Sequence, residues 1–425
     1  MLLEKYLETH NLNLKQFHKH SGFSQATLKN INQRNLAKWN FAVFKALAEV
    51  TGKDTNLVVQ DLEKLQSTLE NNTGTEREKR FSLENRRYIG NKNKLLDWIF
   101  SLLKEHTQGD SFIDIFAGTG VVSQRALKHY SHVILNDFLY SNQVIYQAFF
   151  GSEAYDQDKL ARYVTKFQQL QTNTLDDDYF VTNYGDKFFS EKDARVIGEI
   201  RTQIEQALDL TVREKNILLA SLIYSADRIA NTVGHYDAYR KLAHVPDKFE
   251  FILINPLTIS DQQQVEIYRQ DANILASQVS ADIAFVDPPY NSRQYSRFYH
   301  VLEVLTKWEK PQLSGVAMKP PAENISSYCK TSAPQVFADL VEKLQVKYIV
   351  VTYNNTYTSK SKSSQNKITH EQILAALEKV GNTQVFSQPF AYFNTGKTEL
   401  TDHKEFVFIT KVNQDRKQQS NKATE

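Results

Sequence analysis

The stretch Phe-Ile-Asp-Ile-Phe-Ala-Gly-Thr-Gly at residues 112–120 decides how this chain folds. Its apolar beginning predicts a buried strand, its glycines predict a tight turn, and residues 121–127 begin a helix. Gly118 and Gly120 have no Cβ, so the backbone of this turn can approach a ligand closely. This order of elements is typical of a parallel α/β sheet that binds a ligand at the carboxyl ends of its strands.

Further apolar runs predict strands that alternate with amphipathic helical stretches. With residues 111–116, the predicted strands are residues 132–135, 281–286, 348–352 and 406–409. The alternation predicts an α/β fold with a doubly wound, mostly parallel sheet. Residues 150–265 lack this alternation and are helical and polar in character. We therefore expect them to form a domain inserted between two strands.

An acidic residue after the second predicted strand indicates the kind of ligand. Asp137 follows the run that begins at Val133, and a carboxylate there can accept hydrogen bonds from both ribose hydroxyls of an adenosine. Asp114 precedes the glycine turn, and no Gly-Lys-Ser/Thr follows it, so the turn lacks the pattern of a phosphate-binding loop. These residues favour a nucleoside over a triphosphate.

The most specific motif is Asp287-Pro288-Pro289-Tyr290, directly after the predicted strand at 281–286. Two prolines fix the backbone and remove hydrogen-bond donors, so the Asp287 carboxylate and the Pro288 carbonyl can hold the two hydrogens of an amino group. Tyr290 can stack on the ring that carries this amine, a contact that contributes roughly 1–3 kcal/mol. The alternative is a proline-kinked turn with a capping aspartate.

These motifs together resemble the amino-methyltransferases of DNA. Arg-Tyr-Ile-Gly-Asn-Lys at residues 87–92 is similar to the extra cofactor motif of the Dam-like, D12-class adenine methylases, and the motif order is that of their alpha group. The resemblance covers residues 86–410. It implies a Rossmann-like methyltransferase sheet with S-adenosylmethionine as cofactor, and direct methyl transfer to N6 of a flipped adenine in duplex DNA. Residues 86–149 and 266–415 would form the catalytic domain.

The resemblance also implies roles for individual residues. The methionine end of the cofactor would meet Tyr88, Gly90 and Lys92. The turn residues Phe116, Gly118 and Gly120 would wrap the cofactor with Asp114, Asp137 would hold the ribose, and Asp271 would meet the cofactor's adenine amino group. The target adenine would be held by Asp287, Pro288, Pro289 and Tyr290, with Tyr353, Asn354 and Asn355 near its pocket. Residues 404–408 resemble the family's closing hairpin strand.

Residues 1–60 predict a small helical unit. Gly22 suits a tight turn between two helices, and Ser24 can cap the next one. The segment resembles the helix-turn-helix of Cro/repressor-like domains, in which the second helix enters the major groove. On that resemblance the DNA-facing residues are Ser24, Gln25, Thr27, Lys29 and Asn30. A helical bundle for dimerisation or regulation is the alternative. Residues 61–85 are interpreted as an exposed linker.

The predicted insert supplies further candidates for DNA contact. Its polar donors Arg228, Asn231, Tyr239, Arg240 and Lys241 lie around Gly234, which permits a bend. The alternative is a helix end with solvated charges. Arg293 and Arg297 follow the Asp-Pro-Pro-Tyr motif and could brace the displaced strand or its phosphates. For the basic loop at residues 359–364, phosphate contact and a plain solvated loop are equally favoured.

Composition excludes several other classes of protein. The net charge of +2 neither demands nor excludes nucleic acid, and no apolar run approaches the ~18 residues of a membrane span. The single cysteine, Cys329, permits no internal disulfide and lacks the preceding proline expected of a cytosine carbon-5 methylase. The histidines show no metal-ligand spacing, so no metal is expected. We expect a cytoplasmic protein with a disordered tail at residues 416–425.

Several functional alternatives stay open at this stage. The same acceptor pair fits the N4 amine of cytosine, and RNA could replace DNA as the substrate. A regulator that only senses the cofactor is a third alternative. The expected partners are double-stranded DNA and a cognate restriction endonuclease acting at the same site, with the chain a monomer or weak dimer. The N-terminal unit could also bind the protein's own promoter and limit its expression.

Overall fold

The computed structural model describes residues 2–10, 12–33, 36, 39–72, 80–170, 179–357, 365–389 and 403–413. The chain divides into two compact units, Met1–Lys79 and Arg80–Glu425. The basic loop at residues 359–364 and the predicted tail at residues 416–425 lie outside the described residues.

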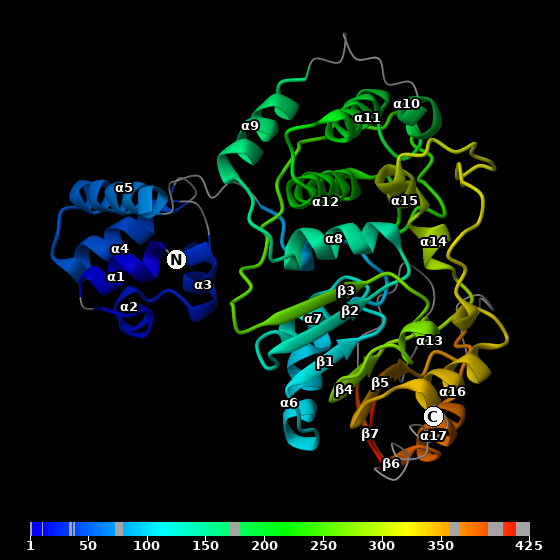
Figure 1. The fold of residues 1–425 in the computed structure, drawn as a ribbon. Helices are drawn as coiled ribbons and strands as arrows, with labels where there is room; N and C mark the ends of the chain where they lie inside the picture. Colours follow the sequence, from blue (N-terminus) through cyan, green and yellow to red (C-terminus); the bar gives the residue numbers. More distant parts are fainter. Residues whose placement is uncertain are drawn as a thin grey trace. The chain divides into compact units, whose positions relative to one another are not determined.

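A seven-stranded sheet organises the larger unit (Figure 1). Its strand order is β3-β2-β1-β4-β5-β7-β6, and all strands are parallel except β7, which is antiparallel to both β5 and β6. The strands are β1 (Ser111–Asp114), β2 (His132–Asn136), β3 (Gln264–Tyr268), β4 (Ile283–Val286), β5 (Tyr348–Asn354), β6 (Gly381–Pro389) and β7 (Lys404–Val412). This is the predicted α/β class with a mostly parallel sheet.

Alternate residues of the central strands face two separate hydrophobic cores, because side chains alternate along a strand. Phe112 and Phe285 belong to one core, whereas Ile113 and Ala284 belong to the other. The first core includes residues of the helices α6 (Leu96–His106), α7 (Val121–Ala126), α8 (Tyr140–Phe150), α12 (Val212–Ile229) and α15 (His300–Lys307). The second includes residues of α13 (Ala272–Leu275), α16 (Ala333–Lys343) and α17 (His370–Glu378). Both faces are therefore covered, as in a doubly wound sheet.

All five predicted strands form, with ends shifted by a few residues, and two further strands were missed. β3 begins at Gln264, inside the stretch predicted as an insert. β6 is at the edge of the sheet and alternates between exposed and half-buried residues, so it lacks an apolar run. Pairing with a neighbouring strand, rather than burial, makes these two segments strands.

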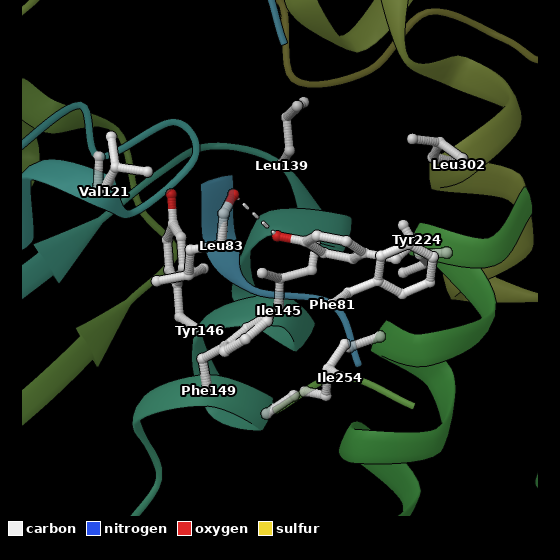
Figure 2. Packing of buried hydrophobic residues seen from close by; sticks show 14 of the residues in the cluster. Phe81, Leu83, Val121, Leu139, Ile145, Tyr146, Phe149, Tyr224, Ile254 and Leu302 are labelled. Atoms are coloured by element: carbon white, nitrogen blue, oxygen red, sulfur yellow. Dashed lines mark hydrogen bonds between the residues drawn. The ribbon is translucent and has the colours of Figure 1, made fainter. Parts of the chain in front are cut away.

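The inserted stretch is helical as predicted, but it shares its core with the sheet. It contains α9 (Gln157–Gln168), α10 (Tyr179–Tyr184), α11 (Glu191–Gln206) and α12, and Figure 1 shows α8, α12 and α11 in successive layers on one side of the sheet. Figure 2 shows Tyr224 of α12 packed among Phe81, Ile145 and Ile254, with its hydroxyl 3.4 Å from the Leu83 carbonyl oxygen. The insert is continuous with the catalytic module.

The smaller unit consists of α1 (Leu2–Thr9), α2 (Leu14–Ser21), α3 (Gln25–Gln33), α4 (Phe41–Thr51) and α5 (Thr55–Asn72). Gly22 ends α2 in the left-handed region, with φ of 71°, and Ser24 Oγ accepts a hydrogen bond from the Thr27 N–H at 3.1 Å. The bounds predicted for the exposed linker, residues 61–85, are wrong at both ends. Leu62 of α5 is buried in the small unit's core, and Leu83 is buried in the large unit's core.

Candidate active site

The Asp287 carboxylate lies just beyond the carboxyl end of β4 and receives three donors. Lys92 Nζ is 2.9 Å from Oδ2, while the hydroxyls of Tyr290 and Thr352 donate to Oδ1 at 2.6 and 2.8 Å. Lys92 also donates to the Tyr290 hydroxyl at 2.7 Å. Burial disfavours the ammonium, but Asp287 and Glu405 outweigh this and raise the pKa of Lys92. The carboxylate is thus held rigidly at a strand end where α/β sheets bind ligands.

Backbone anchors hold the turn that carries this carboxylate. The Tyr290 carbonyl accepts hydrogen bonds from the Lys367 N–H at 2.7 Å and from the Tyr353 hydroxyl at 3.1 Å. Pro288 is buried, and the Tyr290 ring lies 4.5 Å from that of Tyr353. The stacking role of Tyr290 stays a prediction. Its hydroxyl also positions Asp287, which the sequence did not predict.

The glycine turn after β1 has the backbone that the sequence predicted. Gly118 and Gly120 have φ values of 54° and 81°, which favour glycine. The Gly118 N–H donates to Asp137 Oδ2 at 3.1 Å, and its carbonyl accepts from the Tyr146 hydroxyl at 2.7 Å. A Cβ at position 118 would stand 3.2 Å from the Tyr88 ring. The turn thus brings Tyr88 and Asp137 to one place.

Two carboxyl groups line this turn, and burial raises the pKa of both. Burial raises the pKa of Asp114 to about 7, partly offset by the Ser123 hydroxyl, which donates to Oδ2 at 2.7 Å. Oδ1 of Asp114 is buried without a hydrogen-bond partner within the described ranges. Burial also raises the pKa of Asp137, against hydrogen bonds from Leu139 and Gly118. Perturbed carboxyls with unmet polar atoms at a strand end are typical of a binding site.

The Tyr88 motif forms the next wall of this site. The Tyr88 ring stacks on Tyr299 at 4.8 Å and 8°, and the buried Arg86 guanidinium lies 4.9 Å from its centre. The Ile89 N–H donates to the Tyr299 hydroxyl at 2.9 Å, and Gly90 adopts φ of 85°. Tyr88 therefore lies next to the glycine turn and Lys92 next to Asp287, and their contact with a cofactor stays a prediction.

Asp271 and Phe116 follow the carboxyl ends of β3 and β1. Asp271 caps α13, and its Oδ1 accepts a hydrogen bond from the Asn273 N–H at 2.9 Å. Asn273 accepts from the Tyr328 hydroxyl at 2.7 Å, and the Tyr328 ring meets Phe116 edge-on at 5.0 Å. Asp271, Phe116 and Asp137 thus belong to one edge of the sheet. The carboxylate acceptors at this edge suit the hydroxyl and amino donors of an adenosine.

A protein family matches this chain over the residues that build the site. The D12 class N6 adenine-specific DNA methyltransferase family matches residues 88–366, which includes the motifs from Tyr88 to Tyr290. The chain belongs to this family.

Curated relatives of this D12-class chain include proteins from bacteria and from a virus. It is 33% identical over 288 residues to modification methylase LlaI of Lactococcus lactis subsp. lactis, covering 63% of this chain and 46% of LlaI. It is 28% identical over 336 residues to the type II methyltransferase M.NlaIII of Neisseria lactamica (75% and 95% covered). It is 30% identical over 338 residues to M.CviAII of Paramecium bursaria Chlorella virus 1 (77% and 98% covered). The chain therefore spans about half the length of LlaI.

The insert residues predicted to contact DNA differ in their exposure and in their contacts within the protein. Asn231 donates from its amide nitrogen to the Lys187 and Arg240 carbonyl oxygens, each at 2.8 Å, so it closes its own loop. Arg228 is paired with Glu250 at 3.2 Å, and Tyr239 is half-buried. Arg240 and Lys241 are exposed. DNA contact by these residues stays a prediction.

The other predicted DNA contacts are spread over both units. Ser24, Gln25 and Thr27 are exposed, as is Asn30, while the Lys29 side chain lies outside the described part. Ser24 Oγ and Thr27 Oγ1 lie 2.8 Å apart. In the larger unit, Arg297 donates from Nη1 to the Pro320 carbonyl oxygen at 2.6 Å. Their role on DNA also stays a prediction.

Several site residues were missed or given a lesser role from the sequence. Thr352 lies inside an ordinary apolar strand, where nothing distinguished it. Glu405 is 6% exposed, pairs in register with Asn354 and raises the pKa of Lys92, whereas the sequence suggested only a structural strand. Tyr299 lies four positions after Tyr295, and this aromatic spacing on a helical stretch was a usable signal. Asn355 accepts a hydrogen bond from the Lys404 N–H at 2.9 Å, so it braces β7.

The described residues offer neither a metal site nor a membrane-spanning helix. They include no group of three or more His, Cys, Asp or Glu side chains that could hold a metal ion. None of the helices they form has the length and apolar character needed to cross a bilayer.

Proposed function

We propose that this chain transfers a methyl group from S-adenosylmethionine to N6 of adenine in duplex DNA. The observation that carries the proposal is the Asp287 carboxylate, held by Lys92, Tyr290 and Thr352 beside the glycine turn. An exocyclic amine needs such an acceptor, because a hydrogen bond from the amine orients its nitrogen lone pair. Membership of the D12 class supports adenine rather than cytosine as the substrate.

The residues at the glycine turn fit the cofactor. Gly118 leaves room that a Cβ would fill, and Asp114 Oδ1 is a buried acceptor that no described residue satisfies. Asp137 would hold the ribose, Asp271 the adenine amino group, and Tyr88 with Gly90 the methionine end. When bound, S-adenosylmethionine supplies a methyl group on a good sulfur leaving group. Phe116 and Gly120 would close the wall around it.

The protein's part in the reaction is alignment and polarisation of the amine. In the transfer, N6 would bond to the methyl carbon as the carbon–sulfur bond breaks with its electron pair on sulfur, and the proton lost from N6 would pass to solvent. Asp287 and the Pro288 carbonyl would orient the two amine hydrogens, and in-line placement can lower the barrier by about 7–11 kcal/mol. Because the amine is inaccessible in stacked duplex DNA, the base would be flipped at a cost of a few kcal/mol.

The decisive experiment uses the full chain with tritiated S-adenosylmethionine and unmethylated genomic DNA, followed by digestion to nucleosides. We expect label in N6-methyladenine. We also expect Asp287→Ala to lose at least about a hundredfold in turnover while its cofactor affinity is retained. Label in N4-methylcytosine, label in RNA but not in DNA when total RNA is offered in a parallel reaction, or near-normal turnover of Asp287→Ala would each overturn the proposal.

We further propose that the chain is the modification enzyme of a restriction-modification system. The relatives named as modification methylases support this. The partner would be an endonuclease that cuts the same site. The test maps modified sites by sequencing and asks whether a plasmid modified by this chain resists endonucleases encoded beside its gene. Cutting of fully modified sites would contradict the proposal.

The smaller unit suggests a second DNA contact. The exposed Ser24, Gln25 and Thr27 begin α3 after the Gly22 turn. We propose that α3 binds the protein's own promoter. In the full chain, Gln25→Ala should weaken the gel shift of promoter DNA and leave methylation rates unchanged. Equal promoter binding by this variant and by Glu8→Ala, a control on α1, would exclude the contact.

A further inference from the structure

A cleft of about 390 Å³ adjoins the Asp-Pro-Pro-Tyr motif and has no part in the function proposed so far. One wall is the insert loop around His235 and Asp237, and the other is the segment Ser292–Phe298, which contains α14 (Tyr295–Phe298). Figure 1 shows α14 between α15 and the sheet. The cleft therefore joins the inserted stretch to the catalytic motif.

An aromatic platform forms the base of this cleft. The rings of His235 and Phe298 lie 4.5 Å apart at an interplanar angle of 10°, which is a parallel stack. Burial lowers the pKa of His235, partly offset by Asp237, so the ring is neutral at pH 7 and offers a stacking surface. The Arg293 guanidinium lies 5.6 Å from the centre of the Phe298 ring. Stacked rings beside an arginine are the usual components of a site for an unstacked base.

The charge of the cleft favours an anion. Arg293 and Arg297 both line it, while the Asp237 carboxylate forms an ion pair with Lys319. Arg297 is held by its Nη1 contact with the Pro320 carbonyl oxygen at 2.6 Å. Gln294 Nε2 donates to the Ser326 carbonyl oxygen at 2.9 Å, and Gln294 Oε1 accepts from the Ser326 N–H at 2.8 Å. These two hydrogen bonds fix the Gln294 side chain in the wall of the cleft. The guanidinium groups of Arg293 and Arg297 can therefore bind a phosphate in this cleft.

The cleft is tied to both the cofactor motif and the target turn. The Tyr236 N–H donates to the Phe298 carbonyl at 2.7 Å, and the Tyr295 hydroxyl donates to the Ile89 carbonyl at 3.2 Å. Arg293 follows Tyr290 by three residues, which span at most about 11 Å. This upper limit exceeds the rise of one base step along a DNA strand, about 3.4 Å, so the cleft can reach the nucleotide next to the target base.

We propose that this cleft binds one nucleotide of the target strand next to the flipped adenine, with its base stacked on His235 and its phosphate on Arg293 and Arg297. The site would keep the neighbour of the target base unstacked, and so hold the strand open. The inference rests on the proposed function, because it requires duplex DNA as the substrate.

The stacking part is tested with a matched pair of variants. His235→Ala removes the ring and should raise the KM for DNA by roughly fivefold to 150-fold, the range for one base stacked on an aromatic ring. His235→Phe keeps a ring and should restore most of the affinity. Cofactor affinity should be unchanged in both. His244→Ala, in an exposed part of the insert, is the control.

The phosphate part is tested with duplexes that contain the mapped target site. Single methylphosphonate linkages are placed in turn at each position flanking the adenine. In the wild-type chain a methylphosphonate at one position should weaken binding, and in Arg297→Gln the same substitution should weaken binding less, while the slope of log affinity against log salt falls by about one. Thermal melting verifies that the variant is folded.

The outcomes separate this inference from the proposed function. If the wild-type chain forms no methyladenine, the function itself is wrong. If it does, but His235→Ala and Arg297→Gln behave like His244→Ala, the cleft does not bind a nucleotide. Equal loss in His235→Phe and His235→Ala would exclude stacking. Single-stranded RNA that competes as well as the target strand would exclude DNA as the specific occupant.

Discussion

Lys92 Nζ lies 2.9 Å from Asp287 Oδ2, in a pair whose side chains are 5% and 16% exposed. The other carboxylate oxygen already accepts two hydroxyl donors, from Tyr290 and Thr352. A carboxylate oxygen offers about two lone-pair sites, so Oδ2 keeps one for a further donor. The ion pair therefore leaves one direction from which a target amine can approach Asp287.

This arrangement predicts that Lys92 and Asp287 act as a unit. Lys92→Met should lower turnover by about a hundredfold, because the carboxylate loses the partner that fixes it. The double variant with Asp287→Asn should be no slower than Asp287→Asn alone. Single-turnover methylation rates of the four proteins measure the coupling. Additive losses would mean that Lys92 acts elsewhere in the site.

Thr352 is predicted to position Asp287. Thr352→Val has nearly the same shape but loses the hydroxyl that donates to Oδ1 at 2.8 Å. The loss of one hydrogen bond of about 1 kcal/mol should reduce kcat about fivefold, with cofactor affinity unchanged. Thr352→Ser should recover most of kcat. A purely structural role would lower the melting temperature of the valine variant without changing kcat.

Gly118 is predicted to be required for cofactor binding. In Gly118→Ala, alanine would have to adopt a φ of 54°, in the left-handed region. Its Cβ would lie 3.2 Å from the Tyr88 ring. The strain of about 1–2 kcal/mol lowers folding stability, and the displaced Tyr88 ring should weaken cofactor binding by about tenfold or more. Calorimetric titration with S-adenosylmethionine measures this. Gly234→Ala, where the built Cβ meets nothing within 4 Å, is the control for backbone strain.

Asp114 should make folding stability depend on pH. Burial raises its pKa from 3.8 to about 7 in the folded chain, so the folded state holds the proton more tightly than the unfolded chain. This contribution is fully present below about pH 4 and is lost as the pH rises through 7. Asp114→Asn should therefore gain stability relative to wild type across this range, by a few kcal/mol at most. Denaturant unfolding at pH 4.5, 6 and 8 tests the trend, and a constant difference would contradict it.

Cys329 is predicted to be chemically inert. Burial raises the pKa of its thiol to about 12, and Sγ contacts the Arg293 carbonyl oxygen at 3.3 Å. The folded chain should resist alkylation by iodoacetamide at pH 8, and Cys329→Ala should keep most of its methylation rate. A large loss of turnover with normal folding would indicate covalent catalysis by the thiol, contrary to direct transfer.

The motifs of the site could be predicted because each depends on a few consecutive residues. The φ values at Gly118 and Gly120 and the prolines at 288 and 289 belong to local backbone chemistry, which a short window contains. The five apolar strands were predictable for the same reason. The end of α5 was missed because Val58 and Leu62 continue the apolar spacing of the helix into a stretch whose polar residues suggested a linker.

The sequence by itself determined the glycine turn, the Asp-Pro-Pro-Tyr motif and the parallel sheet that carries them. Only the tertiary structure decided the partners of Asp287, because Lys92 and Thr352 lie far from it along the chain and meet it only where β4, β5 and the Tyr88 motif converge. The same holds for β3 and β6, whose weak apolar patterns become strands through pairing with β2 and β7. Contacts between distant segments depend on how whole elements pack, and no local pattern specifies that packing.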